Sequence, residues 1–173
     1  MIKNIKSKLL NNKGMSLLEM TCSIALLLIV FAIVVTCILT ASETYMKSVT
    51  YAEAQTLCAT ISTAMRDECS FSTTGTVIDK DTNKIKKFGS GIQHVVITED
   101  IFSSEVKDQE GVIYLGDSLL IPSGLYGSYL NGFVDVTYKD GNFEIAITVS
   151  NNSGAELASN LVYVRPFVTP TVE

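Results

Sequence analysis

The feature that most constrains this chain is an uncharged apolar run near its N-terminus, MTCSIALLLIVFAIVVTCIL, from Met20 to Leu39. An α-helix rises about 1.5 Å per residue, so a helix of about twenty residues is about 30 Å long, which is the thickness of the hydrocarbon core of a bilayer. We therefore expect this run to cross a membrane. A buried helix of a soluble protein is the alternative, although so long a run without a charge is unusual there.

The charges beside the run predict its orientation. Four lysines precede it within residues 1–13, with no acid among them: Lys3, Lys6, Lys8 and Lys13. The segment that follows, ASETYMK, carries both signs. Because an excess of lysine marks the cytoplasmic side, we expect a single-pass inner (cytoplasmic) membrane protein with its N-terminus inside and its bulk exported. A cleaved secretory signal would have a shorter apolar region, and TASET (Thr40–Thr44) is only a weak cleavage site for one.

The border of the run, KGMSLLEM from Lys13 to Met20, contains one carboxylate, Glu19. A charged side chain at the bilayer centre costs at least about 2.5–3.5 kcal/mol, and less near the interface. Position alone leaves two interpretations open. Glu19 is either a boundary residue without a role or a carboxylate that requires a cationic partner.

Lys13-Gly14, then Met15, then Glu19 as the fifth residue counted from Met15, followed by an apolar helix, resembles the class III signal of type IV pilins and pseudopilins. The resemblance implies that a prepilin peptidase removes the leader, residues 1–14, by cutting between Gly14 and Met15 on the cytoplasmic side. The same enzyme would then N-methylate Met15. Methionine in place of the commoner phenylalanine is a mild departure from the family pattern.

The resemblance also gives Glu19 a role in assembly. Cleavage leaves a charged amine at Met15, about 6 Å from Glu19 along the axis of one helix. In a bundle, the amine of one subunit can meet Glu19 of a neighbour. At about 4 Å and an effective dielectric constant near 20, that pair attracts by about 4 kcal/mol before desolvation. The implied partners are the prepilin peptidase, other pilin subunits in a helical filament, an assembly platform in the membrane, and lipid before assembly.

The helix is expected to continue beyond the membrane. No proline or glycine occurs between Met15 and Phe71, which predicts a helix over residues 15–70 with its transmembrane part at about 18–40. An apolar stripe at helical spacing is expected to pack on a downstream domain: Met46, Val49, Leu57, Ile61 and Ala64. Many type IV pilins carry a proline near the position of Thr36, and this chain does not.

Residues 71–173 predict a β-rich head. The strand candidates are Ile92–Thr98, Gly111–Gly116, Gly132–Tyr138, Asn142–Val149 and Asn160–Phe167. Asp140-Gly141 is a strong hairpin signal, and the segment SNNSGAELASN (Ser150–Asn160) is expected to be an exposed loop. The predicted fold is α+β, with the second half of the long N-terminal helix packed on a C-terminal antiparallel β-sheet head.

The charge balance argues against non-specific nucleic-acid binding by bulk charge. The chain has 13 basic and 18 acidic residues, and loss of the leader's four lysines changes the net charge from −5 to −9. One lysine-rich segment, Lys80 with Lys84, Lys86 and Lys87, is expected to be a solvated loop or edge strand, with a small basic contact for DNA or an anionic surface as the alternative. Asp79, Asp81 and Asn83 begin like a calcium loop, but a lysine follows where glycine is needed, so we expect no metal site and no cofactor.

Enzymatic activity is not expected. The single histidine, His94, lies in a strand candidate, and no nucleophile elbow or phosphate-binding loop is present. All four cysteines are expected to be unpaired: Cys22, Cys37, Cys58 and Cys69. Two functions remain. One is a filament subunit, a minor pilin or pseudopilin serving adhesion, motility, secretion or DNA uptake. The other is a monomeric signal-anchored surface domain that binds a ligand or wall polymer.

Overall fold

The computed structural model describes residues 16–104, 111–127 and 129–173. The chain forms two compact units, residues 1–47 and 48–173. Helix α2 (Leu17–Ser70) supplies almost all of the described residues of the first unit and the first element of the second. Its C-terminal end agrees with the predicted helix over residues 15–70, while Met15 lies outside the described residues.

The part of α2 in the second unit buries one face. Its buried apolar residues are spaced three or four apart, as an amphipathic helix requires: Ala54, Leu57, Cys58, Ile61, Met65 and Cys69. The predicted stripe is therefore correct in its centre, at Leu57 and Ile61, and wrong at Met46, which is exposed. The buried face of α2 instead includes Ala54, while the neighbouring Glu53 is exposed.

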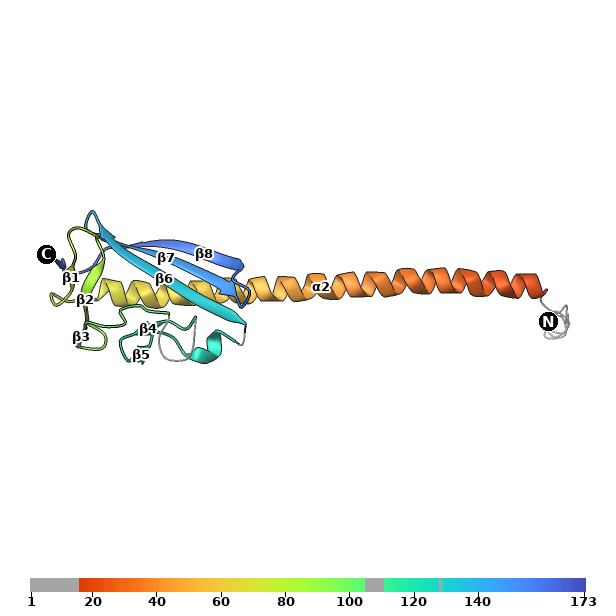
Figure 1. The fold of residues 1–173 in the computed structure, drawn as a ribbon, viewed down its shortest axis with the longest axis horizontal. Helices are drawn as coiled ribbons and strands as arrows, with labels where there is room; N and C mark the ends of the chain where they lie inside the picture. The colour runs from red at the N-terminus through yellow and green to blue at the C-terminus, as the bar shows by residue number, and fades with distance from the viewer. Residues whose placement is uncertain (1–15, 105–110, 128) are drawn as a thin grey trace, which may run out of the picture. The chain divides into compact units, whose positions relative to one another are not determined.

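A three-stranded antiparallel sheet covers this face of α2. Its strands lie in the order β6 (Leu130–Lys139), β7 (Asn142–Asn151) and β8 (Glu156–Val164), as Figure 1 shows. The predicted hairpin is confirmed, with Asp140 and Gly141 at φ of 52° and 81° in the turn between β6 and β7. Alternate residues of β7 point into the core: Phe143, Ile145, Ile147 and Val149.

The rest of the head is built from short strands. A second sheet has the order β3 (Val95–Ile97), β2 (Ile85–Ser90), β1 (Val77–Ile78) and β9 (Thr171–Val172). A small hairpin joins β4 (Tyr114–Leu115) to β5 (Ser118–Leu119), and a single 3-10 turn, η1, spans Ser123–Leu125. The α+β layout is as predicted. The head is not wholly antiparallel, because β9 pairs in parallel with β1.

Several predicted strands are shorter or shifted. His94 lies in the turn before β3 at φ 57°, not inside a strand. The predicted loop Ser150–Asn160 is wrong, since β7 extends to Asn151 and β8 begins at Glu156. The Asn151 side chain closes the short turn between them by accepting hydrogen bonds from the Ser153 and Ala155 amides at 3.1 and 2.9 Å.

Candidate functional site

Glu19 lies in the first turn of α2. A carboxylate there is favoured by the positive end of the helix dipole. Just before the helix, the Ser16 carbonyl accepts a hydrogen bond from the Met20 amide at 3.1 Å. Glu19 is exposed and forms no ion pair with any residue that the structure describes. Gly14 and Met15, the predicted cleavage and methylation residues, lie outside the described residues.

The helix after Glu19 presents apolar side chains on every face. Large aliphatic and aromatic residues between Leu17 and Leu39 expose 36–85% of their surface. In the described part of the chain, α2 is the one helix long and apolar enough to cross a membrane, with a mean hydropathy of 3.1 over its best 18 residues. Such a surface is unfavourable in water.

The hydroxyl groups within this apolar stretch are satisfied by the helix itself. Thr21 donates to the Leu18 carbonyl at 2.9 Å and Ser23 to the Glu19 carbonyl at 2.8 Å. Thr36 donates to the carbonyls of Ala32 at 3.2 Å and Ile33 at 2.8 Å. Because these hydroxyls need no external partner, the helix can enter an apolar environment intact.

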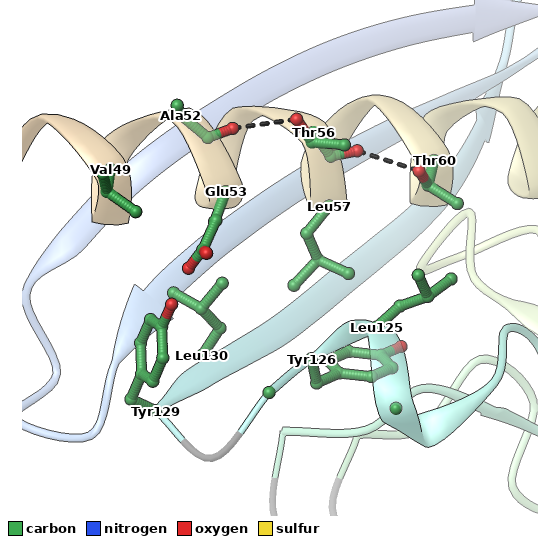
Figure 2. A pocket seen from close by; sticks show the side chains of 12 residues that line it. Val49, Ala52, Glu53, Thr56, Leu57, Thr60, Leu125, Tyr126, Tyr129 and Leu130 are labelled. Carbon is green, nitrogen blue, oxygen red and sulfur yellow. Dashed lines mark hydrogen bonds between the residues drawn. The ribbon is translucent and has the colours of Figure 1, made fainter.

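In the second unit, α2 and the segment around η1 form an open groove of about 440 Å³. Figure 2 shows Leu57, Tyr126 and Leu130 forming its apolar floor. Glu53 and Tyr129 lie at its rim, with the phenol oxygen of Tyr129 directed toward the Glu53 carboxylate. The Tyr126 hydroxyl instead accepts a hydrogen bond from the Ile113 amide at 3.1 Å, which fixes the ring as part of the core. The sequence did not predict this groove.

The end of α2 places a carboxylate in the core. Glu68 is 7% exposed and accepts a hydrogen bond from Ser90 Oγ of β2 at 2.8 Å. Burial raises the pKa of Glu68, the neighbouring charge of Asp67 adds to that rise, and the Ser90 hydrogen bond opposes it. The sequence did not predict that Glu68 is buried. We interpret it as a structural element of the core.

The lysine-rich segment forms an exposed turn that leads into β2. Lys86 Nζ lies 3.7 Å from Asp79 Oδ1, and the same oxygen accepts a hydrogen bond from the Asp81 amide at 3.0 Å. The Asp81 hydrogen bond is the largest cause that lowers the pKa of Asp79, and Lys86 adds to it. No group of three His, Cys, Asp or Glu side chains among residues 16–104, 111–127 and 129–173 is arranged to hold a metal ion.

The cysteines are unpaired, as the sequence predicts. Cys58 and Cys69 are buried, while Cys22 and Cys37 lie on the apolar part of α2. Burial raises the pKa of the Cys69 thiol far above its ordinary value, so the thiolate is strongly disfavoured there. Cys69 therefore acts as a small apolar core residue.

Comparisons of the chain with models of protein families, with curated proteins and with solved structures find no match. Its function is therefore argued from its own residues.

Proposed function

We propose that this chain is a structural subunit of a type IV pilus-like filament, in the form of a minor pilin or a pseudopilin. Residues 1–14 are a leader that a prepilin peptidase removes between Gly14 and Met15, and the new N-terminus at Met15 is methylated. The mature subunit resides in the cytoplasmic membrane before assembly. It then polymerises through α2 on an assembly platform. The filament that results lies at the cell surface.

The observation that carries this proposal is the combination of Glu19 with a fully uncovered apolar helix surface. A simple membrane anchor needs the apolar surface, but it gains nothing from a carboxylate in the first turn. A filament built from such helices needs both. The apolar surface covers neighbouring helices, and Glu19 neutralises the methylated amine of an adjacent subunit.

The proposal is tested in the organism that makes the protein, by substituting Glu19→Gln. This change removes the charge and keeps the size. Loss of an attraction of about 4 kcal/mol, partly offset by desolvation, is expected to reduce the amount of subunit in sheared surface filaments by at least about tenfold. The membrane-bound amount is expected to stay unchanged, because leader removal depends on Gly14.

Glu43→Gln is the matched control. Glu43 is another exposed carboxylate of α2, but it lies beyond the apolar run. Its substitution is expected to leave filament content unchanged. If both variants had the same filament content, the proposed role of Glu19 in assembly would be contradicted. A complete absence of the chain from sheared filaments of the unsubstituted strain would favour a signal-anchored surface domain that acts as a monomer.

A further inference from the structure

Strand β8 has an unpaired edge. It is the outer strand of the β6-β7-β8 sheet and pairs only with β7 (Figure 1). Within the described residues, no backbone hydrogen bond joins Glu156–Val164 to any segment other than β7. A nine-residue edge strand with open amide and carbonyl groups can accept another strand.

The opposite edge of the same sheet is protected. Lys84 forms a bridge with Thr137 of β6, and the Tyr138 amide donates to the Asn83 carbonyl at 2.9 Å. Further along β6, the Gly132 amide donates to the Gly111 carbonyl at 2.7 Å. The second sheet ends in strands of only three and two residues, β3 and β9. Among the described strands, β8 therefore combines length with an open edge.

The residues of β8 also lack the features that usually prevent an edge strand from pairing with another strand. From Leu157 to Val164 the strand has no charged residue and no proline. Leu161 and Tyr163 expose 49% and 65% of their surface on the outer face of the sheet. On a processed chain with a net charge of −9, this uncharged strand is a place where two copies can approach without repulsion between like charges.

The ends of the strand favour a second copy of the same chain in an antiparallel arrangement. Glu156 begins β8 and Arg165 follows its last residue, and both are exposed. Neither forms an ion pair with another described residue. Two antiparallel β8 strands would bring Glu156 of each copy next to Arg165 of the other, whereas a parallel pair would bring like charges together.

We propose that β8 is a homotypic docking edge, at which two copies pair antiparallel to form one continuous six-stranded sheet. The strand runs in the same direction as the end of α2, because Asn160 Nδ2 donates to Ser62 Oγ at 3.0 Å and the Phe167 amide donates to the Ser70 carbonyl at 3.0 Å. The paired copies therefore have oppositely directed α2 ends.

Disulfide formation tests the contact on the processed full chain in detergent. The background has Cys22→Ser and Cys37→Ser, and it retains the buried Cys58 and Cys69. Asn160→Cys and Leu161→Cys lie on either side of the midpoint between Glu156 and Arg165. A disulfide requires Cα atoms within about 7 Å, so at least one of these variants is expected to form dimers under mild oxidation.

Ala146→Cys is the matched control. Ala146 lies directly across from Leu161 on the outer face of β7 and is also exposed to solvent, but it is not at an edge. It is expected to remain monomeric. Cross-linking of the control to the same extent, or of neither edge variant, would overturn the proposal.

A charge reversal tests the arrangement by sedimentation over a concentration series. Glu156→Arg is expected to weaken dimerisation by about tenfold, because it converts two attractive contacts into repulsive ones. The double variant Glu156→Arg, Arg165→Glu is expected to restore it. Glu99→Arg, an exposed acid distant from β8 in the sequence, makes the same change in net charge and is the control. A monomeric unsubstituted chain, or a double variant as weak as the single one, would contradict the proposal.

Discussion

Ser90 Oγ of β2 donates a hydrogen bond of 2.8 Å to Glu68 Oε2 of α2, and both side chains are buried. This contact ties the end of the long helix to the second sheet through a carboxylate. Burial nevertheless raises the pKa of Glu68 above its ordinary value of 4.5, so the hydrogen bond does not fully compensate for the lost hydration.

Glu68 is therefore expected to make the stability of the head depend on pH. Its pKa is higher in the folded than in the unfolded state, so its favourable contribution is complete below about pH 4.5 and is lost as the pH rises through the raised value. Glu68→Gln should reduce the loss of stability with rising pH. The stability of the head at neutral pH should then be closer to its stability at acidic pH. Urea unfolding at several pH values measures the effect. Asp67→Asn, at the adjacent exposed position, should retain most of the pH dependence.

Gly132 is a point of close approach between β6 and α2. A Cβ atom added there would lie 3.0 Å from Ile61 Cδ1 and 3.1 Å from Tyr126 Cε1. Gly132→Ala is expected to destabilise the head by about 1–3 kcal/mol through overpacking. Ile61→Val removes the Cδ1 atom, so the double variant should lose less stability than the sum of the single changes. Additive losses in denaturant unfolding would show that the two residues do not interact.

Tyr126 links the floor of the groove to the segment before β4. Its hydroxyl accepts the Ile113 amide hydrogen bond, and its side chain is 2% exposed. Tyr126→Phe should cost about 1–3 kcal/mol, because it leaves a buried amide without a partner. Tyr163→Phe removes a 3.4 Å contact to Glu144 on the solvent side and should be nearly neutral. A neutral Tyr126→Phe would mean that water replaces the lost oxygen.

The turn that contains Asp79, Asp81 and Asn83 is not expected to bind calcium. Asp79 Oδ1 already accepts the Asp81 amide, and Lys86 Nζ lies 3.7 Å away, where its charge opposes a cation. Millimolar CaCl2 should leave the thermal unfolding midpoint of the head unchanged relative to an equal ionic strength of NaCl. A rise that saturates with calcium and disappears in Asp81→Asn would reverse this conclusion.

The residue pattern predicted the long helix and strands but not the short strands. The absence of glycine and proline predicted α2 up to Ser70, and alternating apolar residues with Asp140-Gly141 predicted the β6–β7 hairpin. The start of β8 was missed because Glu156, Ala158 and Ser159 are polar or small. Asn151 also closes the turn before β8 through side-chain hydrogen bonds that residue spacing does not reveal. The parallel pairing of β9 with β1 depends on tertiary packing of a two-residue strand.

The candidate site residues also differed in how well the sequence alone predicted them. Glu19 stood out because a carboxylate at the border of an apolar run is locally costly. Glu68 did not stand out, because whether an acid near a helix end is solvated or buried depends on what packs against it. Its neighbour Ser90 lies 22 residues away in the sequence.

The central claim is tested most directly by mass spectrometry of the mature N-terminus, on protein sheared from the cell surface and on the membrane fraction. The account predicts a chain that begins at N-methylated Met15 and is present in the sheared fraction. A chain that begins at Met1, or near Ala41, would contradict it, and this would then be an anchored or secreted surface domain in which Glu19 has no role in assembly.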